Sequence, residues 1–203
     1  MIVPERPAAA EPEGGLVLVH GRGADERDLL GLLDELDPER RLDGYSPRGP
    51  LSLPPGGAHW YAVPRVGYPD PATFAEGFAA LAGFVDSLPH DRIVLGGFSQ
   101  GAVMSLAVGL GEGRPSPAAV IAFSGFVPTV AGWGLREEAP FPPVAVAHGS
   151  YDPVIPVEFA HRAVEQLRAA GAEVLYRESP MGHAIDPAFV AELRPWVRAA
   201  VAG

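Results

Sequence analysis

The chain has 203 residues, of which 47% are hydrophobic and 20% charged, and its formal net charge is -10. This length suits one globular domain with a real core, and we expect residues 1–203 to form it. The diffuse acidic balance argues against nucleic acid or an anionic membrane as the main partner. The lack of cysteine excludes disulfides, thiolate catalysis and Cys-ligated metals.

The start of the chain, MIVPERPAAAEPEGG, has no basic segment followed by an apolar one, so no signal peptide is predicted. No apolar run reaches the roughly 18 residues that a membrane-spanning helix needs. We therefore expect a cytoplasmic protein without a membrane span. Residues 1–13, rich in Pro, Ala and Glu, are predicted to be a loose tail or an edge segment.

The first half of the chain opens with a buried strand at residues 15–21, an apolar run that ends in glycine. Residues 25–36 have apolar side chains at helical spacing, which predicts a helix. Residues 42–64 are rich in Pro and Gly and predict mostly loop, with a short strand near the start. Residues 70–88 open with Asp-Pro, a pair that suits the start of a helix, and predict an amphipathic helix.

The second half alternates strands and helices. Apolar runs predict strands at residues 91–98, 118–125, 142–150 and 172–180. Helices are predicted at residues 100–111, 156–171 and 186–203, the last kinked at Pro195. Because the strands are continuous apolar runs, they indicate an α/β fold with a mostly parallel central sheet and helices on both faces.

Polar residues follow three of these strands. Ser99 follows the strand at 91–98, and Asp152 and His183 follow the last two strands in turn. In such sheets the active site lies outside the carboxyl ends of the strands. A serine hydroxyl needs an imidazole to accept its proton, and a carboxylate to orient that imidazole. The chain order Ser, Asp, His is that of α/β-hydrolases, and it predicts a catalytic triad.

The segment GGFSQG predicts that Ser99 lies on a tight turn between a strand and a helix. Gly97 and Gly101 flank it, since such a corner leaves no room for Cβ atoms. The oxyanion formed during attack needs two N–H donors. We expect one from the backbone of Gln100, at the positive start of the helix, and the other from Arg22 in the segment HGRGAD.

Other residues compete for these roles. Ser124 in FSGF is the rival nucleophile, but Ala122 replaces the first glycine of the motif. Asp152 is preferred to the other Asp-Pro aspartates because it alone follows a buried strand and precedes the candidate histidine. His20 and His148 end strands and are expected to tie loops by hydrogen bonds. The remaining histidines are expected to be solvated: His59, His90 and His161.

Several segments together resemble the phospholipase/carboxylesterase family of α/β-hydrolases, which includes small bacterial carboxylesterases and acyl-protein thioesterases. They are LVLVHGRGAD, GGFSQGAVMSLAVGL, FSGFVP, HGSYDPVIPVEFA and MGHAID. The match covers nearly all of the chain after residue 14. The resemblance implies an α/β-hydrolase fold and a serine esterase, with no metal and no cofactor. It assigns the triad to Ser99, Asp152 and His183 and the oxyanion hole to Arg22 and Gln100.

Two positions depart from the family pattern. Arg22 stands where the family usually has an apolar residue, commonly Leu, and Ala62 stands where the family tends to have Asp. Both departures affect substrate choice more than reaction type. An apolar acyl pocket is expected from Trp60, Phe126, Trp133, Ile155 and Met181.

The expected function is hydrolysis of small or medium acyl esters through an acyl-serine intermediate, with a small-molecule ester as the partner. An acyl-protein thioesterase or lysophospholipase acting on longer chains is the alternative. A non-catalytic binding protein of the same fold is disfavoured because all three triad residues are present. Short loops leave no room for a large lid, and a homodimer is left open.

Overall fold

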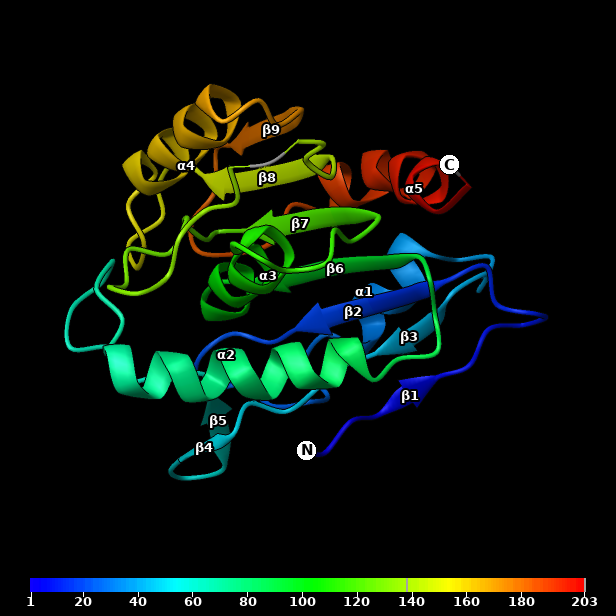
Figure 1. The fold of residues 1–203 in the computed structure, drawn as a ribbon, viewed down its shortest axis with the longest axis horizontal. Helices are drawn as coiled ribbons and strands as arrows, with labels where there is room; N and C mark the ends of the chain where they lie inside the picture. Colours follow the sequence, from blue (N-terminus) through cyan, green and yellow to red (C-terminus); the bar gives the residue numbers. More distant parts are fainter. Residues whose placement is uncertain (138, 203) are drawn as a thin grey trace.

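The computed structural model describes residues 1–137 and 139–202. A seven-stranded sheet forms its centre, in the order β1-β3-β2-β6-β7-β8-β9 (Figure 1). The strands are β1 Glu5–Arg6, β2 Gly15–Val19, β3 Asp43–Tyr45, β6 Ile93–Phe98, β7 Ala119–Phe123, β8 Val144–Gly149 and β9 Val174–Ser179. Only β1 is antiparallel to its neighbour, so the predicted mostly parallel sheet is confirmed.

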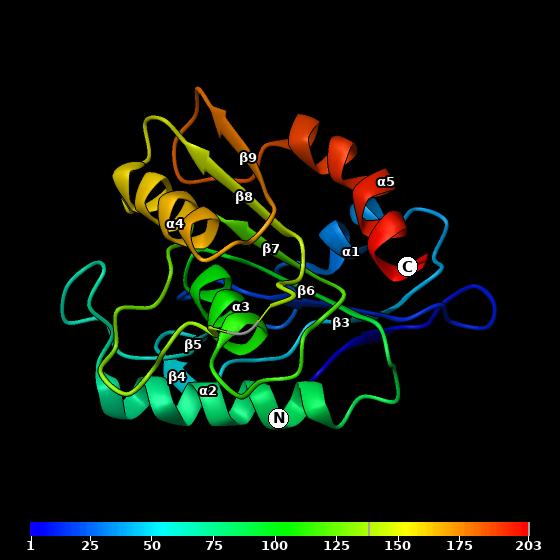
Figure 2. The same ribbon diagram turned by 45° about the horizontal axis from the view of Figure 1, so that its top comes forward.

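Helices cover both faces of the sheet, as Figure 2 shows. One face carries α1 (Leu30–Leu36) and α5 (Pro187–Ala202). The other face carries α2 (Pro71–Asp86), α3 (Gln100–Leu110) and α4 (Glu158–Ala169). Pro195 lies inside α5, which continues past it, and Gly203 lies outside the described residues. No helix in the described part of the chain is long and apolar enough to cross a bilayer.

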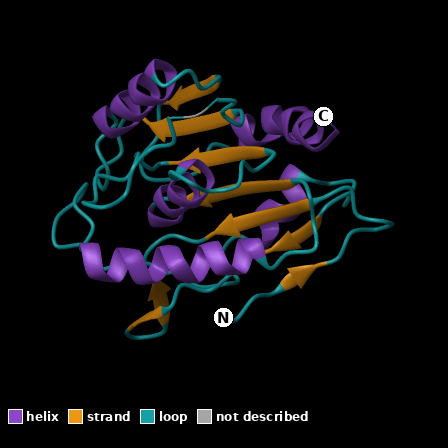
Figure 3. Ribbon diagram, in the orientation of Figure 1, coloured by secondary structure: helices purple, strands orange, loops and turns teal. Residues whose placement is uncertain are grey.

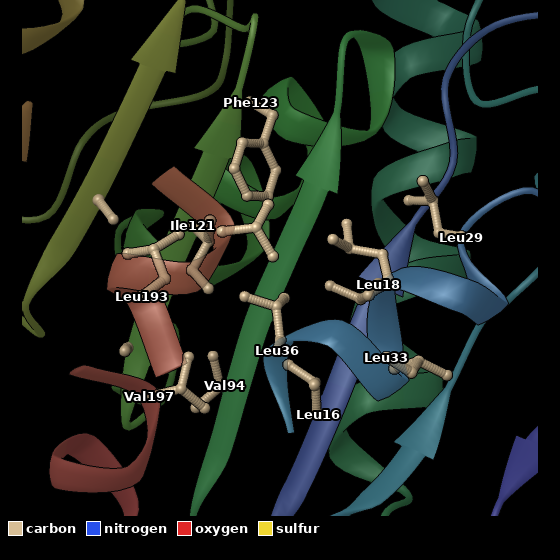
Figure 4. Close-up of a cluster of buried hydrophobic side chains, with 14 of the residues drawn as sticks. Leu16, Leu18, Leu29, Leu33, Leu36, Val94, Ile121, Phe123, Leu193 and Val197 are labelled. Carbon is tan, nitrogen blue, oxygen red and sulfur yellow. The ribbon is translucent and has the colours of Figure 1, made fainter. Parts of the chain in front are cut away.

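Alternate residues of the central strands face the two helical layers. Leu16 and Leu18 of β2 face α1 and α5, whereas Val17 and Val19 face α2 and α3. Figure 4 shows the first layer, in which Leu33 of α1 and other apolar side chains of α1 and α5 pack over β2, β6 and β7. Burying one such side chain contributes about 1.5 to 3 kcal/mol, and strands buried on both faces need apolar residues at every position.

The helix α3 is buried along its whole length, from Gln100 to Leu110. It packs on the sheet, and its residues belong both to the apolar cluster shared with α2 and to the one shared with α4. The nearly all-apolar sequence of residues 100–111 is therefore explained by burial on most sides. Ser99, directly before α3, is held by an element that is packed on every side.

The first helix is shorter than predicted. The expected helix over residues 25–36 begins only at Leu30, so the prediction of its start is wrong. The carboxylate of Asp25 accepts the N–H of Arg27 at 2.8 Å, a side-chain turn that competes with helix formation. Glu26 is turned toward Arg48, with 2.6 Å between the charged atoms.

The Pro- and Gly-rich segment at 42–64 contains more structure than predicted. The expected short strand near its start is β3, but a hairpin of β4 (Leu51–Leu53) and β5 (Gly57–His59) was not predicted. Figure 3 shows this hairpin apart from the central sheet. Ala58 bonds through its backbone with Gly23 at 2.8 Å and Ala24 at 2.7 Å, so the hairpin holds the loop that follows β2.

The N-terminal segment is anchored at Glu5–Arg6, which pairs with β3 as the edge strand of the sheet. Of the two predicted alternatives for residues 1–13, the edge segment describes this part. The Arg6 side chain is only 8% exposed and its guanidinium lies 2.7 Å from the Asp37 carboxylate. It also donates to the carbonyl of Leu42 at 2.9 Å, so the buried charge is paired and hydrogen-bonded.

Candidate active site

Ser99 lies on the corner between β6 and α3, with φ 54 and ψ -117. A non-glycine residue rarely adopts a positive φ, and the strain costs about 1 to 3 kcal/mol. Glycine is required on both sides of the corner. A Cβ at Gly97 would lie 2.5 Å from the backbone of Gly101, and one at Gly101 would clash with the carbonyl oxygen of Val19.

The structure brings Ser99, His183 and Asp152 into one chain of hydrogen bonds. The Nε2 atom of His183 lies 2.9 Å from the Ser99 hydroxyl oxygen. The Nδ1 atom of the same ring lies 2.6 Å from Oδ2 of Asp152. With Nδ1–H donating to the carboxylate, the Nε2 lone pair is left to accept the serine proton. The Phe98 ring, 4.7 Å from the imidazole between centroids, packs beside His183.

The Asp152 carboxylate is fixed by its own loop. Its Oδ1 accepts the backbone N–H of Val154 at 2.8 Å and of Ile155 at 2.9 Å. Burial alone would raise the pKa of Asp152, but the hydrogen bonds from His183 and these two N–H groups outweigh it and lower the pKa. Asp152 is therefore ionised at neutral pH, although it is only 8% exposed.

His148 at the end of β8 supports the same loop. Its Nε2–H donates to the carbonyl of Ile155 at 2.8 Å, and the same nitrogen lies 3.3 Å from Oδ2 of Asp152. Burial lowers the pKa of His148, so the ring is neutral. The prediction that His148 ties a loop by hydrogen bonds is confirmed.

His20, directly after β2, also holds loops in place by hydrogen bonds. Its Nδ1–H donates to the carbonyl of Gly21 at 2.7 Å, and its Nε2 accepts the N–H of Gly49 at 3.0 Å. Burial lowers the pKa of His20 as well. The predicted loop-tying role is confirmed here too. By contrast, the prediction that His90 is solvated is wrong, because its side chain is 6% exposed and bonds to Tyr45.

Two residues that line the same cavity as Ser99, Arg22 and Gln100, have backbone N–H groups without a partner among the described residues. The loop after β2 lies against the corner, since a Cβ at Gly21 would be 3.4 Å from the Cβ of Ser99. Within residues 1–137 and 139–202, no backbone or side-chain acceptor receives the N–H of Arg22 or of Gln100. Gln100 is the first residue of α3, where a helix leaves its N–H groups free.

The side chain of Gln100 braces the neighbouring loop. Its Oε1 accepts the N–H of Trp60 at 2.7 Å, and its Nε2 donates to the carbonyl of Tyr61 at 2.7 Å. The Trp60 ring is fully buried and donates to the carbonyl of His20 at 3.1 Å. These bonds connect the start of α3 with both loops that border the site. Trp60 therefore braces these loops, and it is not part of the wall of the cavity beside Ser99.

A cavity of about 90 Å³ lies beside Ser99. The remaining residues of its wall are Arg22, Tyr61, Val63, Val66, Gly67, Tyr68, Pro69, Gln100, Phe126, Val154 and Ile155. Phe126 and Ile155 were predicted to line it. The loop at 61–69 and Val154 were missed, although the apolar residues between predicted elements in WYAVPRVGYP gave a signal.

Trp133 and Met181 do not line this cavity. The Trp133 indole donates to the carbonyl of Ala107 at 3.2 Å and lines a separate hollow of about 440 Å³ beside α2. Met181 contributes its carbonyl, which accepts the N–H of Tyr151 at 3.0 Å. Neither residue is part of the wall of the cavity beside Ser99, so their predicted contact with substrate stays a prediction. In the described part of the chain, no cluster of three His, Asp or Glu side chains is arranged to hold a metal.

The chain is similar to known esterases and thioesterases over nearly its whole length. It is 24% identical to acyl-protein thioesterase 1 of Gibberella zeae, a match that covers 95% of this chain and 92% of that relative. Its fold matches the Bacillus cereus carboxylesterase with a TM-score of 0.82, at 24% identity, over 98% of this chain and 93% of that one. Esterase PE8 matches with a TM-score of 0.79 at 28% identity, over 97% of both chains.

The model of the Phospholipase/Carboxylesterase family matches residues 6–200. That span includes β2 and all later strands of the central sheet, together with Ser99, Asp152 and His183. The chain therefore belongs to the phospholipase/carboxylesterase family of α/β-hydrolases.

Proposed function

We propose that this chain is a serine carboxylesterase that hydrolyses short acyl esters through an acyl-Ser99 intermediate. The observation that carries the proposal is the hydrogen-bond chain from Ser99 through His183 to Asp152, with 2.9 Å and 2.6 Å between its atoms. Ser99 also lines the wall of a cavity, so a substrate placed there can reach its hydroxyl.

In the first half of the reaction, Ser99 Oγ attacks the ester carbonyl carbon as His183 Nε2 takes the hydroxyl proton. The carbonyl π electrons move onto oxygen, and the N–H groups of Arg22 and Gln100 stabilise that oxyanion. Asp152 stabilises the imidazolium. The intermediate collapses, the bond to the alkoxy oxygen breaks, and His183 gives its proton to the leaving alcohol.

In the second half, water attacks the acyl-Ser99 carbonyl and His183 takes the proton of that water. The second tetrahedral intermediate breaks its bond to Ser99 Oγ, which recovers the proton from His183. The acid leaves and the free serine is restored. The enzyme needs no group outside Ser99, Asp152, His183 and the two N–H donors for this cycle.

The size of the cavity supports a short acyl group. Its volume is about 90 Å³. An engineered cavity of about 150 Å³ in another protein holds benzene, so a space of this size suits a chain of few carbons. The larger hollow beside Trp133 shares no lining residue with it, so it does not extend the space beside Ser99.

The alternative, a thioesterase or lysophospholipase acting on longer chains, is supported by the rim of the cavity. Four side chains of its wall are large, hydrophobic and exposed: Val63, Val66, Tyr68 and Val154. A longer acyl chain could lie along them outside the cavity. The thioesterase relative from Gibberella zeae also favours this alternative.

The test of the mechanism is labelling with a fluorophosphonate, followed by peptide mass spectrometry. We expect one modified residue, Ser99, and loss of p-nitrophenyl butyrate hydrolysis in proportion to labelling. Continued hydrolysis by fully labelled protein, or modification at another serine, would overturn the proposal.

A panel of oxygen esters and thioesters from two to sixteen acyl carbons separates the two substrate classes. We expect kcat/KM to be highest at short oxygen esters. A maximum at long thioesters would replace the esterase assignment with the thioesterase one. A cytoplasmic location and a homodimer stay predictions, which cell fractionation and light scattering would test.

A further inference from the structure

The wall of the cavity beside Ser99 carries one charged residue among the residues that the structure describes there, and it is Arg22. The rest of the wall is apolar except for tyrosines, Ser99 and Gln100. A ligand that covered this guanidinium would remove water from it, which is costly unless the ligand brings an anion to the same place.

Arg22 has no anionic partner among the described residues of the protein. None of the ion pairs between described residues uses its side chain, which is exposed to solvent. Its neighbours behave differently. Arg48 pairs with Glu26 at 2.6 Å, and Arg65 lies over the Tyr68 ring at 3.6 Å from its centroid. The Arg22 guanidinium is thus available to a ligand.

The backbone of Arg22 sets where that ligand must carry its charge. Its N–H is one of the two proposed oxyanion donors, so the side chain starts beside the reacting carbonyl. A long flexible arginine stem carries the guanidinium several bonds away from that N–H. An anionic group would meet it only if a few bonds separate that group from the scissile carbonyl.

We propose that Arg22 is a specificity-determining residue that selects esters bearing a free carboxylate, such as monoesters of short dicarboxylic acids. This inference rests on the proposed esterase function. A guanidinium pairs with a carboxylate through two parallel hydrogen bonds, and the apolar wall holds the short hydrocarbon segment between carboxylate and ester. Because the chain carries a net charge of -10, a local cation is needed to hold an anionic substrate there.

The test compares monoethyl glutarate with ethyl glutaramate, a neutral ester of nearly the same shape, by ethanol release. In the unaltered protein we expect kcat/KM to be higher for the carboxylate. In Arg22→Leu, which keeps the backbone N–H, we expect the ratio of kcat/KM for the carboxylate ester to kcat/KM for the neutral ester to fall about 10- to 100-fold. Arg27→Leu is the matched control, since it removes the same charge from an exposed residue outside the cavity wall.

An unchanged preference in Arg22→Leu would overturn this inference, as would an equal loss in Arg27→Leu. A Ser99→Ala variant run on both esters keeps the two proposals distinguishable. If Ser99→Ala hydrolyses both esters at the parental rate, the esterase mechanism itself fails. If Ser99→Ala is inactive and Arg22→Leu keeps the full preference, only the selection by Arg22 fails.

Discussion

Two serine corners lie at the ends of the neighbouring strands β6 and β7, and both serines have the same positive φ. Ser99 and Ser124 both have φ 54. Each donates its N–H to the adjacent strand at 2.8 Å, Ser99 to Phe123 and Ser124 to Ala147. Ser99 meets His183 and borders a cavity, whereas Ser124 is 0% exposed and its hydroxyl has no partner among the described residues. The proposed nucleophile therefore differs from Ser124 in having a proton acceptor and an opening beside it, and not in its φ angle.

The chain that follows each serine explains the difference. After Ser99, α3 starts at once and leaves the hydroxyl at the cavity edge. After Ser124, the chain packs directly on α3, since a Cβ at Gly125 would lie 2.6 Å from the Cβ of Ala102. The helix α3, which begins at the Ser99 corner, therefore covers the Ser124 corner.

The largest expected effect is on catalysis. Ser99→Ala should lower kcat for p-nitrophenyl butyrate by about 10⁴- to 10⁶-fold, because no nucleophile is left beside His183. Ser124→Ala should stay within a few-fold of the parent protein. Steady-state kinetics on both variants test this, with circular dichroism to confirm folding. Comparable losses in the two variants would mean that the corners are not functionally distinct.

The next largest effect is on stability, through the tight packing at the Ser99 corner. Gly101→Ala should lower the free energy of unfolding by about 3 kcal/mol or more, because its Cβ would meet the carbonyl oxygen of Val19. Gly31→Ala in α1 is the control, since a Cβ there meets nothing within 4 Å. Urea denaturation measures both, and the control should be neutral or slightly stabilised. Equal stability of the two variants would contradict the tight packing at this corner.

Acid should destabilise the protein through the buried His20 and His148, which stay neutral in the folded chain. Burial lowers the pKa of both buried rings below its usual value. Only the unfolded chain then takes up protons as the pH falls below about 6.5, so each ring lowers the free energy of unfolding by up to about 1.4 kcal/mol per pH unit. Above that pH the two rings contribute no slope.

Urea midpoints between pH 8 and pH 5.5 measure this slope. His148→Gln, which keeps an N–H that can reach the carbonyl of Ile155, should make it shallower. A slope identical to that of the parent protein would show that His148 is not the group that titrates.

The smallest effect concerns the strain at the second corner. Ser124→Gly should raise the free energy of unfolding by about 1 kcal/mol, because glycine accepts φ 54 and the unpartnered hydroxyl is removed. Esterase activity should stay unchanged. Thermal unfolding followed by circular dichroism is sufficient to detect this. A destabilised Ser124→Gly would show that the buried hydroxyl has a partner in solution.

The sequence predicts best those elements in which every side chain is buried, because the whole element is then a run of apolar residues. Strands such as Ile93–Phe98 are buried on both faces and therefore read as unbroken apolar runs. The positions of Ser99 and Asp152 after such strands, and of His183 after the edge strand β9, follow from the rule that parallel strands end at one edge. The Asp70 N-cap could be predicted too, because its carboxylate bonds to Thr73 only three residues away.

The features that were missed depend on partners far along the chain. The hairpin of β4 and β5 is held by Gly23 and Ala24, which no local pattern in residues 42–64 reveals. The inward turn of Trp60 depends on Gln100, and the buried Arg6 depends on Asp37. The composition of a loop predicts that the loop is irregular. It does not predict which core or cavity the aromatic residues of the loop cover.

The loop at 152–155 couples two properties that a protein engineer would want to vary separately. Asp152 orients His183 through this loop, while Val154 and Ile155 give it their N–H groups and also line the cavity. A change made there to admit a larger acyl group also disturbs the carboxylate on which turnover depends. Val63 and Val66 line the same cavity from a separate loop. Substrate range is thus better redesigned from that side, where the rate of the chemical step is left alone.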